Sequence, residues 1–155
     1  MELLSDEERV YGRALRFVSI RPRSQKEIRF WFKRKRIASG VVQRVFNQLE
    51  RAGFVDDKAF ASWWVEQRLA FRPKALRLIK LELLSKGVAR EIIDEVLAIS
   101  DVPSELETAR ELVKKFEGRL GNLGPKKRKE KLIANLSRRG FGWEVIRKLV
   151  DLDKQ

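Results

Sequence analysis

The side chains best placed to do chemistry in this sequence are lysines and arginines that recur every three or four residues between positions 26 and 36. Residues at this spacing share one side of an α-helix. Part of the pattern returns 51 residues later, and a third basic cluster covers 126–131. Such rows suit phosphates spaced along a strand, because each neutralised phosphate releases counterions. The predicted polyanion-binding residues are Lys26, Arg29, Lys33, Arg36, Arg77, Lys80, Lys127 and Lys131.

Three further cations, Lys35, Lys86 and Arg139, occupy equivalent positions near the ends of predicted helices. They are candidates for additional ligand contacts. A cation near a helix C-terminus is also stabilised by the helix dipole alone, by about 0.3–1 kcal/mol. Both interpretations fit these three residues.

The net charge of +13 over 155 residues indicates attraction to nucleic acid or to an anionic membrane surface. The excess lies at the two ends of the chain. Residues 1–55 contain 13 Lys and Arg against 6 Asp and Glu, residues 102–155 contain 14 against 8, and residues 56–101 contain 8 of each. This distribution fits a long polyanion that is engaged at two places, and it equally fits two solvated faces.

The composition argues against an enzyme. There is no cysteine and no histidine, which removes disulfides, thiol nucleophiles, imidazole bases and the usual zinc ligands. The carboxylates at 56–57 and 91–95 are better explained as a helix cap at Asp57 and a helix surface than as a metal site. We therefore expect no catalytic residue, no metal and no cofactor.

The first eight residues are acidic where a signal peptide would be basic, and no apolar run reaches the roughly 20 residues of a membrane span. These features predict a cytoplasmic protein that does not associate with membranes, and we expect a monomer.

The elements that would position the cations form a repeat. The stretch 83–97 has a copy 53 residues downstream, in which Gly140 corresponds to Gly87. An upstream copy lies 51 residues away, with Arg36 in place of the glycine. A period near 50 residues is typical of a repeat architecture.

Local signals within each period predict three helices. Ser5, Ser24 and Ser104 each precede a glutamate by three residues, which is the pattern of a capping box. Pro22 and Pro73 end first helices, and Gly53 suits a left-handed helix terminus. We predict an all-α fold of three tandem three-helix repeats, 1–55, 56–101 and 102–155, in an elongated, curved array. The last helix is expected over 143–152.

The aromatic residues offer surfaces on which single-stranded bases could stack. Phe32, Phe46, Phe60 and Trp64 lie at core spacing and are expected to be packed. Phe30 and Trp31 remain open, and Trp143, beside Gly142, is expected to be partly exposed.

Several motifs in order resemble the RecX family of bacterial recombinase regulators. They are Arg13-Ala14-Leu15, then 19–24 leading to Glu27-Ile28, then 49–57 with Phe60-Ala61, and Glu82-Leu83 followed by 86–88. The resemblance implies three tandem three-helix repeats without enzymatic activity. It also implies binding to RecA filaments on single-stranded DNA, usually to inhibit ATP hydrolysis and strand exchange in DNA repair and recombination. The basic rows would then be the DNA- or filament-binding residues.

Two other functions fit the residues. A stand-alone helix-turn-helix-like protein would read the major groove, and Gln43, Arg44 and Asn47 could serve in the first repeat. The corresponding helix of the second repeat offers Arg90, Glu91 and Asp94, which do not suit this role. A helical scaffold for an acidic protein also agrees with the charge.

Overall fold

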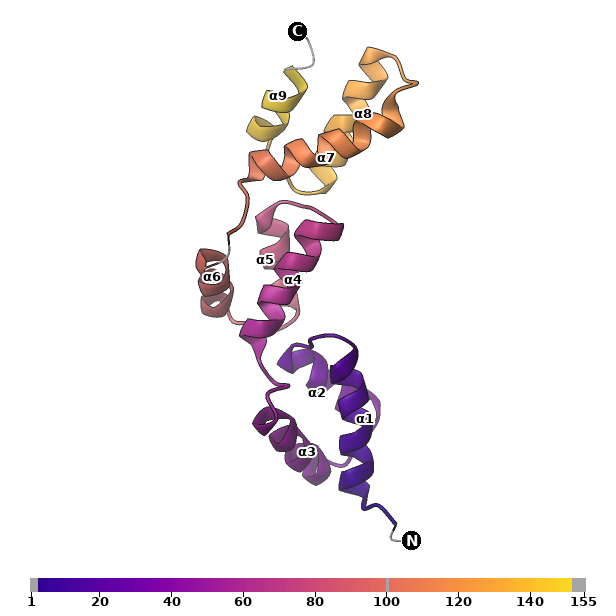
Figure 1. Cartoon of the computed structure of the whole chain (residues 1–155), viewed down its shortest axis with the longest axis vertical. Coiled ribbons are helices and arrows are strands. Elements are labelled where there is room, and N and C mark those ends of the chain that lie inside the picture. The colour runs from indigo at the N-terminus through magenta and orange to yellow at the C-terminus, as the bar shows by residue number, and fades with distance from the viewer. Residues whose placement is uncertain (1–2, 100, 152–155) are drawn as a thin grey trace. The chain divides into compact units, whose positions relative to one another are not determined.

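The computed structural model describes residues 3–99 and 101–151, and every regular element in these ranges is an α-helix. The helices are α1 (Asp6–Ile20), α2 (Gln25–Arg34), α3 (Ser39–Arg51), α4 (Asp57–Phe71), α5 (Leu76–Ser85), α6 (Arg90–Ile99), α7 (Glu105–Leu120), α8 (Pro125–Arg138) and α9 (Trp143–Asp151) (Figure 1). The predicted all-α helical repeat fold is confirmed. Leu152, the expected end of the last helix, lies outside the described residues.

Local capping determines where several helices begin. At Ser5, Ser24 and Ser104 the serine hydroxyl accepts a hydrogen bond from the backbone N–H three residues on, and the glutamate there accepts one from the serine N–H. All three predicted capping boxes are therefore present. Helix α8 instead begins with Pro125 at its first position, where no intrahelical N–H is needed.

The start of α4 corrects one prediction. Asp56, not Asp57, caps this helix, because Asp56 Oδ1 accepts from the Ala59 N–H at 3.0 Å. Asp57 is the first helical residue, and its Oδ1 accepts instead from the backbone N–H of Gln25 at 2.8 Å. Two adjacent aspartates could each have served as the cap, and the contact with Gln25 engages the second of them.

The repeat is clearest at the ends of α2, α5 and α8. Arg36, Gly87 and Gly140 have φ of 55°, 83° and 85°, so all three adopt the left-handed conformation. In each turn the next residue donates its N–H to the carbonyl five positions back, which is the Schellman arrangement. Gly53 has φ 84° and ends α3 in the same way, as predicted.

The helices gather into two compact units. The first compact unit comprises the described residues of 1–64 and 83–99, and the second those of 65–82 and 100–155. Helices α4 and α5 are thus shared between the units.

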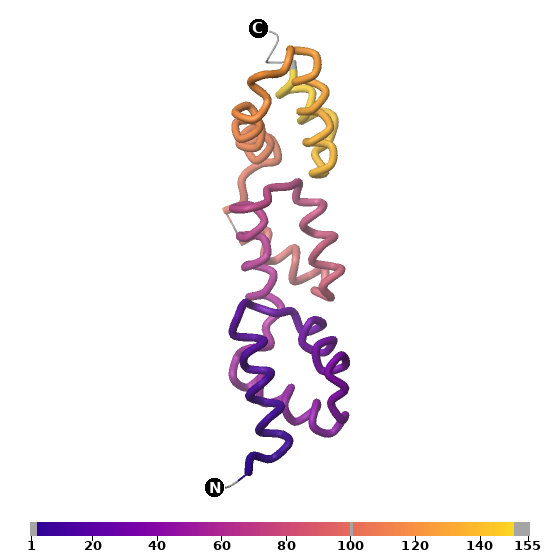
Figure 2. Tube along the Cα trace, turned by 90° about the vertical axis from the view of Figure 1, so that its right-hand side faces the viewer, coloured from indigo at the N-terminus to yellow at the C-terminus, as the bar shows by residue number. Residues whose placement is uncertain are grey.

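Each compact unit has its own apolar core. In the first, α1 packs against α3, and the core includes Ala14, Ile28, Phe32 and Leu49. In the second, α9 packs against both α7 and α8, at the orange and yellow end of the trace (Figure 2). Apolar side chains from those three helices form most of its core, together with Ala75, which lies just before α5, and Phe141, which lies between α8 and α9.

Candidate anion-binding surface

Helix α2 presents two chemically opposite faces. Ile28, Trp31 and Phe32 are buried against the first core, and Trp31 is only 5% exposed. The opposite side carries exposed cations at Lys26, Arg29, Lys33 and Arg34. We call these four residues the α2 basic face.

A surface hollow of about 570 Å³ lies along this face. Besides the four cations of the α2 basic face, Arg23 from the turn before α2 and Lys86 from the end of α5 line this hollow. The lining residues are Phe17, Arg23, Lys26, Glu27, Arg29, Phe30, Trp31, Lys33, Arg34, Ser85 and Lys86. We call this feature the α2 hollow.

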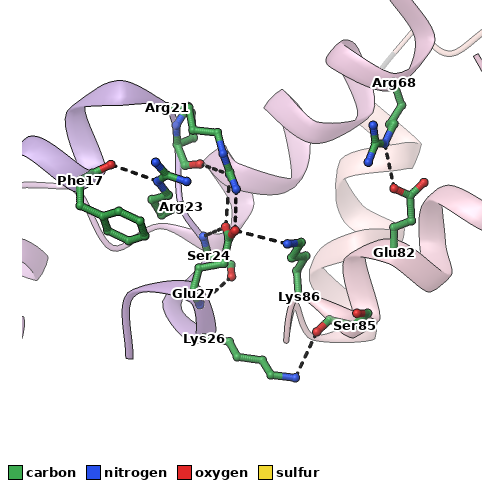
Figure 3. Close-up of polar contacts among 11 residues, drawn as sticks. Phe17, Arg21, Arg23, Ser24, Lys26, Glu27, Arg68, Glu82, Ser85 and Lys86 are labelled. Atoms are coloured by element: carbon green, nitrogen blue, oxygen red, sulfur yellow. Dashed lines mark hydrogen bonds and ion pairs between the residues drawn. The ribbon is translucent and has the colours of Figure 1, made fainter. Parts of the chain in front are cut away.

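Glu27, the one carboxylate of the α2 hollow, is already neutralised. Its Oε2 lies 2.6 Å from Arg21 Nη2 and 3.4 Å from Lys86 Nζ (Figure 3). Burial opposes ionisation of Glu27, but hydrogen bonds from Arg21 and the Ser24 N–H, and the charges of Arg21 and Lys86, outweigh it and lower the pKa of this carboxyl. The remaining cations of the hollow therefore carry uncompensated positive charge.

Arg23 is the most constrained of these cations. Its Nε donates to the Phe17 carbonyl at 3.0 Å, and its guanidinium lies 4.0 Å from the centroid of the Phe17 ring (Figure 3). Burial, and then the nearby charge of Arg21, lower the pKa of Arg23. An anion beside this guanidinium would raise the pKa of Arg23 again, because an opposite charge favours the charged form.

The structure gives the four predicted residues of the first repeat different surroundings. Lys26 Nζ donates to the Ser85 carbonyl at 3.1 Å (Figure 3). The guanidinium of Arg29 lies 4.1 Å from the centroid of the Phe46 ring. In the described part of the chain, Lys33 and Arg36 are exposed and make no ion pair. Lys26 thus has a structural contact that a solvated row would lack.

Arg77 corresponds to Lys26 and has a corresponding contact. Its Nε donates to the Gly140 carbonyl at 2.8 Å. Lys80, Lys127 and Lys131 are exposed. Arg77 and Lys26 therefore each bind a carbonyl near the left-handed turn of a later helix, within their own compact unit.

The three additional candidates also differ. Lys86 pairs with Glu27 and lies 5.4 Å from the Trp64 ring centroid. Arg139 Nη1 donates to the Pro73 carbonyl at 3.0 Å, and burial, followed by the charges of Arg138 and Arg119, lowers the pKa of Arg139. Lys35 is exposed. Lys86 and Arg139 thus hold helix ends together, a role beyond that of a helix dipole.

Arg23 and Arg34 were not among the predicted site residues, and the exposure of Phe30 was not predicted. The available signal was position on the helix, since Phe30 falls opposite Ile28 and Phe32, the residues buried at helical spacing. Phe30 is 61% exposed, and so is Trp143, as expected. Phe32, Phe46 and Phe60 are buried as predicted, while Trp64 is partly buried.

The candidate base-reading residues of α3 are engaged with other side chains. Gln43 Nε2 donates to Asn47 Oδ1 at 3.3 Å, and Arg44 Nε pairs with Glu7 at 2.9 Å. Major-groove readout would require both contacts to be exchanged for base edges. The helix-turn-helix alternative therefore gains no support from this helix.

The residues that the structure describes contain neither a metal-binding cluster nor a membrane-spanning helix. No group of three or more acidic side chains there could hold a metal ion. No helix in the same ranges is long and apolar enough to cross a bilayer.

Comparison with known proteins assigns the family. Models for the second and third three-helix domains of RecX match residues 56–97 and 104–150. The chain is also 31% identical over 147 residues to Regulatory protein RecX of Chlorobium phaeobacteroides (strain BS1), covering 95% of both chains. The chain belongs to the RecX family.

Further relatives agree with this assignment to the RecX regulatory proteins. Regulatory protein RecX of Amycolatopsis mediterranei (strain U-32) is 33% identical over 124 residues, which are 80% of this chain and 71% of that one. The crystal structure of RecX from Lactobacillus salivarius superposes with a TM-score of 0.71 at 23% identity, covering 97% of this chain and 98% of that one. This structural likeness supports the RecX fold.

Proposed function

We propose that this RecX-family protein binds RecA filaments on single-stranded DNA and lowers their ATP hydrolysis and strand exchange. Family membership carries the proposal, since relatives that match along 95% of their length are regulatory proteins. The protein would act by binding, with no catalytic chemistry of its own, inside the cytoplasm and as a monomer.

The α2 hollow supports the nucleic-acid part of this proposal. It brings six cations together around one carboxylate that is already paired with Arg21 and Lys86. A phosphate backbone bound there would release counterions, so affinity should fall as salt rises. Contacts of this kind position a strand without reading its sequence.

We further propose that the predicted repeats, 1–55, 56–101 and 102–155, act together. Exposed cations are available at Lys33 in the first, at Lys80 in the second, and at Lys127 and Lys131 in the third. A long filament could engage all three, and each contact would add to the salt dependence.

The decisive experiment follows ATP hydrolysis by RecA on single-stranded DNA while the protein is added. The expected result is a hydrolysis rate that falls as the protein approaches the concentration of RecA. An unchanged rate at saturating protein would rule out inhibition. A rate that rises would leave regulation standing with the opposite sign.

A further inference from the structure

An aromatic side chain stands in the middle of the α2 basic face without a structural role there. Phe30 is 61% exposed, on the side of the helix opposite the buried Ile28 and Phe32. It lines the α2 hollow together with Lys33 and Arg34. Its ring contributes little to the core, and exposing it to water is unfavourable.

The cations around Phe30 are available for a ligand. The Arg34 guanidinium lies 6.0 Å from the centroid of the Phe30 ring, one helical turn away. In the described residues, neither Lys33 nor Arg34 is paired with a carboxylate. A flat apolar surface therefore lies beside two free positive charges.

The same combination does not recur in the other second helices. The residue 51 positions after Phe30 is Leu81, which is 57% exposed, and Lys33 and Arg34 correspond to Leu84 and Ser85. In α8 the position of Phe30 is taken by Ala134. The aromatic ring and its flanking cations thus belong to the first repeat, and repeat architecture alone does not explain them.

We infer that the α2 hollow is a nucleotide subsite for single-stranded nucleic acid, in which an unpaired base stacks on Phe30 while Lys33 and Arg34 hold the adjacent phosphates. The inference rests on the proposed function and specifies its contact with DNA. Stacking on an aromatic ring tolerates any base, because every base has a π-face. A duplex keeps its bases stacked inside, so it can use the cations but not the ring. The hollow thereby prefers single strands to duplex.

The positive charge alone does not distinguish single-stranded nucleic acid from an acidic protein segment. The exposed Phe30 ring beside the charge does. Carboxylates would satisfy Lys33 and Arg34 equally well, but they would leave Phe30 exposed. An extended strand offers alternating phosphates and bases, which matches cations one turn from an aromatic ring. An acidic peptide is therefore the competing outcome of the test.

The test measures binding of fluorescently labelled oligo(dT), and of a duplex of equal length, to the full chain at several salt concentrations. Phe30→Leu should weaken oligo(dT) binding about fivefold or more, the lower range for losing one stacked base, and change duplex binding less than twofold. Phe30→Trp should bind oligo(dT) with an affinity close to that of wild type, because it keeps an aromatic ring at this position. Phe71→Leu is the matched control, because Phe71 is 74% exposed and does not line the hollow; it should change neither.

A second variant, Lys33→Gln with Arg34→Gln, should weaken the binding of both oligo(dT) and duplex. It should also reduce the salt dependence of their affinities. If Phe30→Leu leaves oligo(dT) binding unchanged, or weakens both ligands equally, the stacking subsite is wrong. If poly-glutamate displaces oligo(dT) equally from wild type and Phe30→Leu, the hollow is a general anion site. An unchanged thermal melt confirms that Phe30→Leu is folded.

The RecA assay separates this inference from the proposed function. If wild type and Phe30→Leu inhibit hydrolysis equally and bind oligo(dT) equally, the subsite proposal is wrong and the proposed regulation stands. If wild type binds oligo(dT) through Phe30 but leaves hydrolysis unchanged, the proposed regulation is wrong and the subsite proposal stands.

Discussion

The Asp57 carboxylate accepts a hydrogen bond from the backbone N–H of Gln25, with 2.8 Å between Oδ1 and N. Gln25 is the first residue of α2, where the helix leaves its N–H groups without internal partners. The carboxylate also lies at the positive end of the helix dipole. The first residue of α4 thus caps a helix that begins 32 residues earlier.

Removing this carboxylate should loosen the start of α2. Asp57→Ala is expected to lower the free energy of unfolding by about 1–2 kcal/mol, the usual range for losing a helix-capping acceptor. Urea unfolding measures the loss, and amide hydrogen exchange at Gln25 should accelerate. Asp94→Ala, on the exposed side of α6, is the control and should stay within about 0.5 kcal/mol. Equal stability of both variants would contradict a capping role.

Gly87 should tolerate no side chain. It has φ 83°, and an added Cβ would lie 2.7 Å from Lys26 Cβ. The left-handed conformation alone costs a non-glycine residue about 1–2 kcal/mol, so Gly87→Ala should destabilise the protein by at least that amount. Gly12→Ala is the matched control: Gly12 lies within α1 with no atom within 4 Å of an added Cβ, and alanine there should stabilise by about 0.5–1 kcal/mol. Thermal unfolding compares the two variants.

Arg36 occupies the corresponding turn of the first repeat at the expense of conformational strain. With φ 55°, Arg36→Gly should raise the free energy of unfolding by about 0.5 kcal/mol, because relief of strain exceeds the entropy that glycine adds to the unfolded chain. The same variant removes an exposed cation, so DNA binding should weaken. Stability that falls on this substitution would show that the arginine side chain makes a stabilising contact.

Lys26 and Lys33 provide a paired test of structural and ligand roles on one helix face. Both Lys26→Glu and Lys33→Glu should weaken binding to single-stranded DNA and to RecA filaments. Each lost phosphate contact should reduce the log-log salt slope by about 0.7. Only Lys26→Glu should also lower stability, by about 1 kcal/mol, since only Lys26 donates to the Ser85 carbonyl. Unfolding and binding are measured on the same samples. A Lys26→Glu variant that is as stable as wild type would contradict the structural role of Lys26.

The array as a whole is tested by combining charge reversals. Lys26→Glu with Arg29→Glu should weaken filament binding, and adding Arg77→Glu and Lys80→Glu should weaken it further. The second pair contributes cations from α5, in which Lys80 is exposed and Arg77 also donates to the Gly140 carbonyl, so a thermal melt checks that the four-residue variant is folded. A four-residue variant that binds as well as the two-residue variant would show that α5 makes no contact with the filament.

Glu27 should make stability depend on pH in the acid range. Burial alone would raise the pKa of Glu27, but the hydrogen bonds from Arg21 and the Ser24 N–H, together with the charges of Arg21 and Lys86, lower it in the folded protein. The unfolded chain then binds more protons as pH falls below the ordinary glutamate pKa of about 4.3. The contribution of Glu27 is present above that pH and is lost as pH falls through the folded pKa. Urea unfolding of Glu27→Gln should therefore show a flatter pH dependence than wild type below about pH 5.

Local features were predictable from the sequence because their causes lie within a few residues. The capping boxes at Ser5, Ser24 and Ser104 each connect residues three apart. The left-handed turns at Gly87 and Gly140 follow from the backbone freedom of glycine. Arg36 was placed in the same turn by repeat spacing alone, against its own conformational preference.

The candidate site was predicted in part. The basic side of α2 followed from helical spacing, and the exposure of Trp143 followed from its neighbouring glycine. The α2 hollow could not be predicted from helical spacing, since it also requires Arg23 from the preceding turn and Lys86 from the end of α5. Residue spacing gives no information about which distant side chains will line the same surface.

Residue spacing and local backbone preference thus account for the helices, most of their ends, the repeat and the cationic face. They could not assign partners to Asp57, Lys26 or Arg139, which bond to groups 32, 59 and 66 residues away. Those partners depend on how helices pack within each compact unit, and packing is governed by the combined fit of many apolar side chains. The same lysine spacing therefore produces a structural contact at Lys26 and a free cation at Lys33.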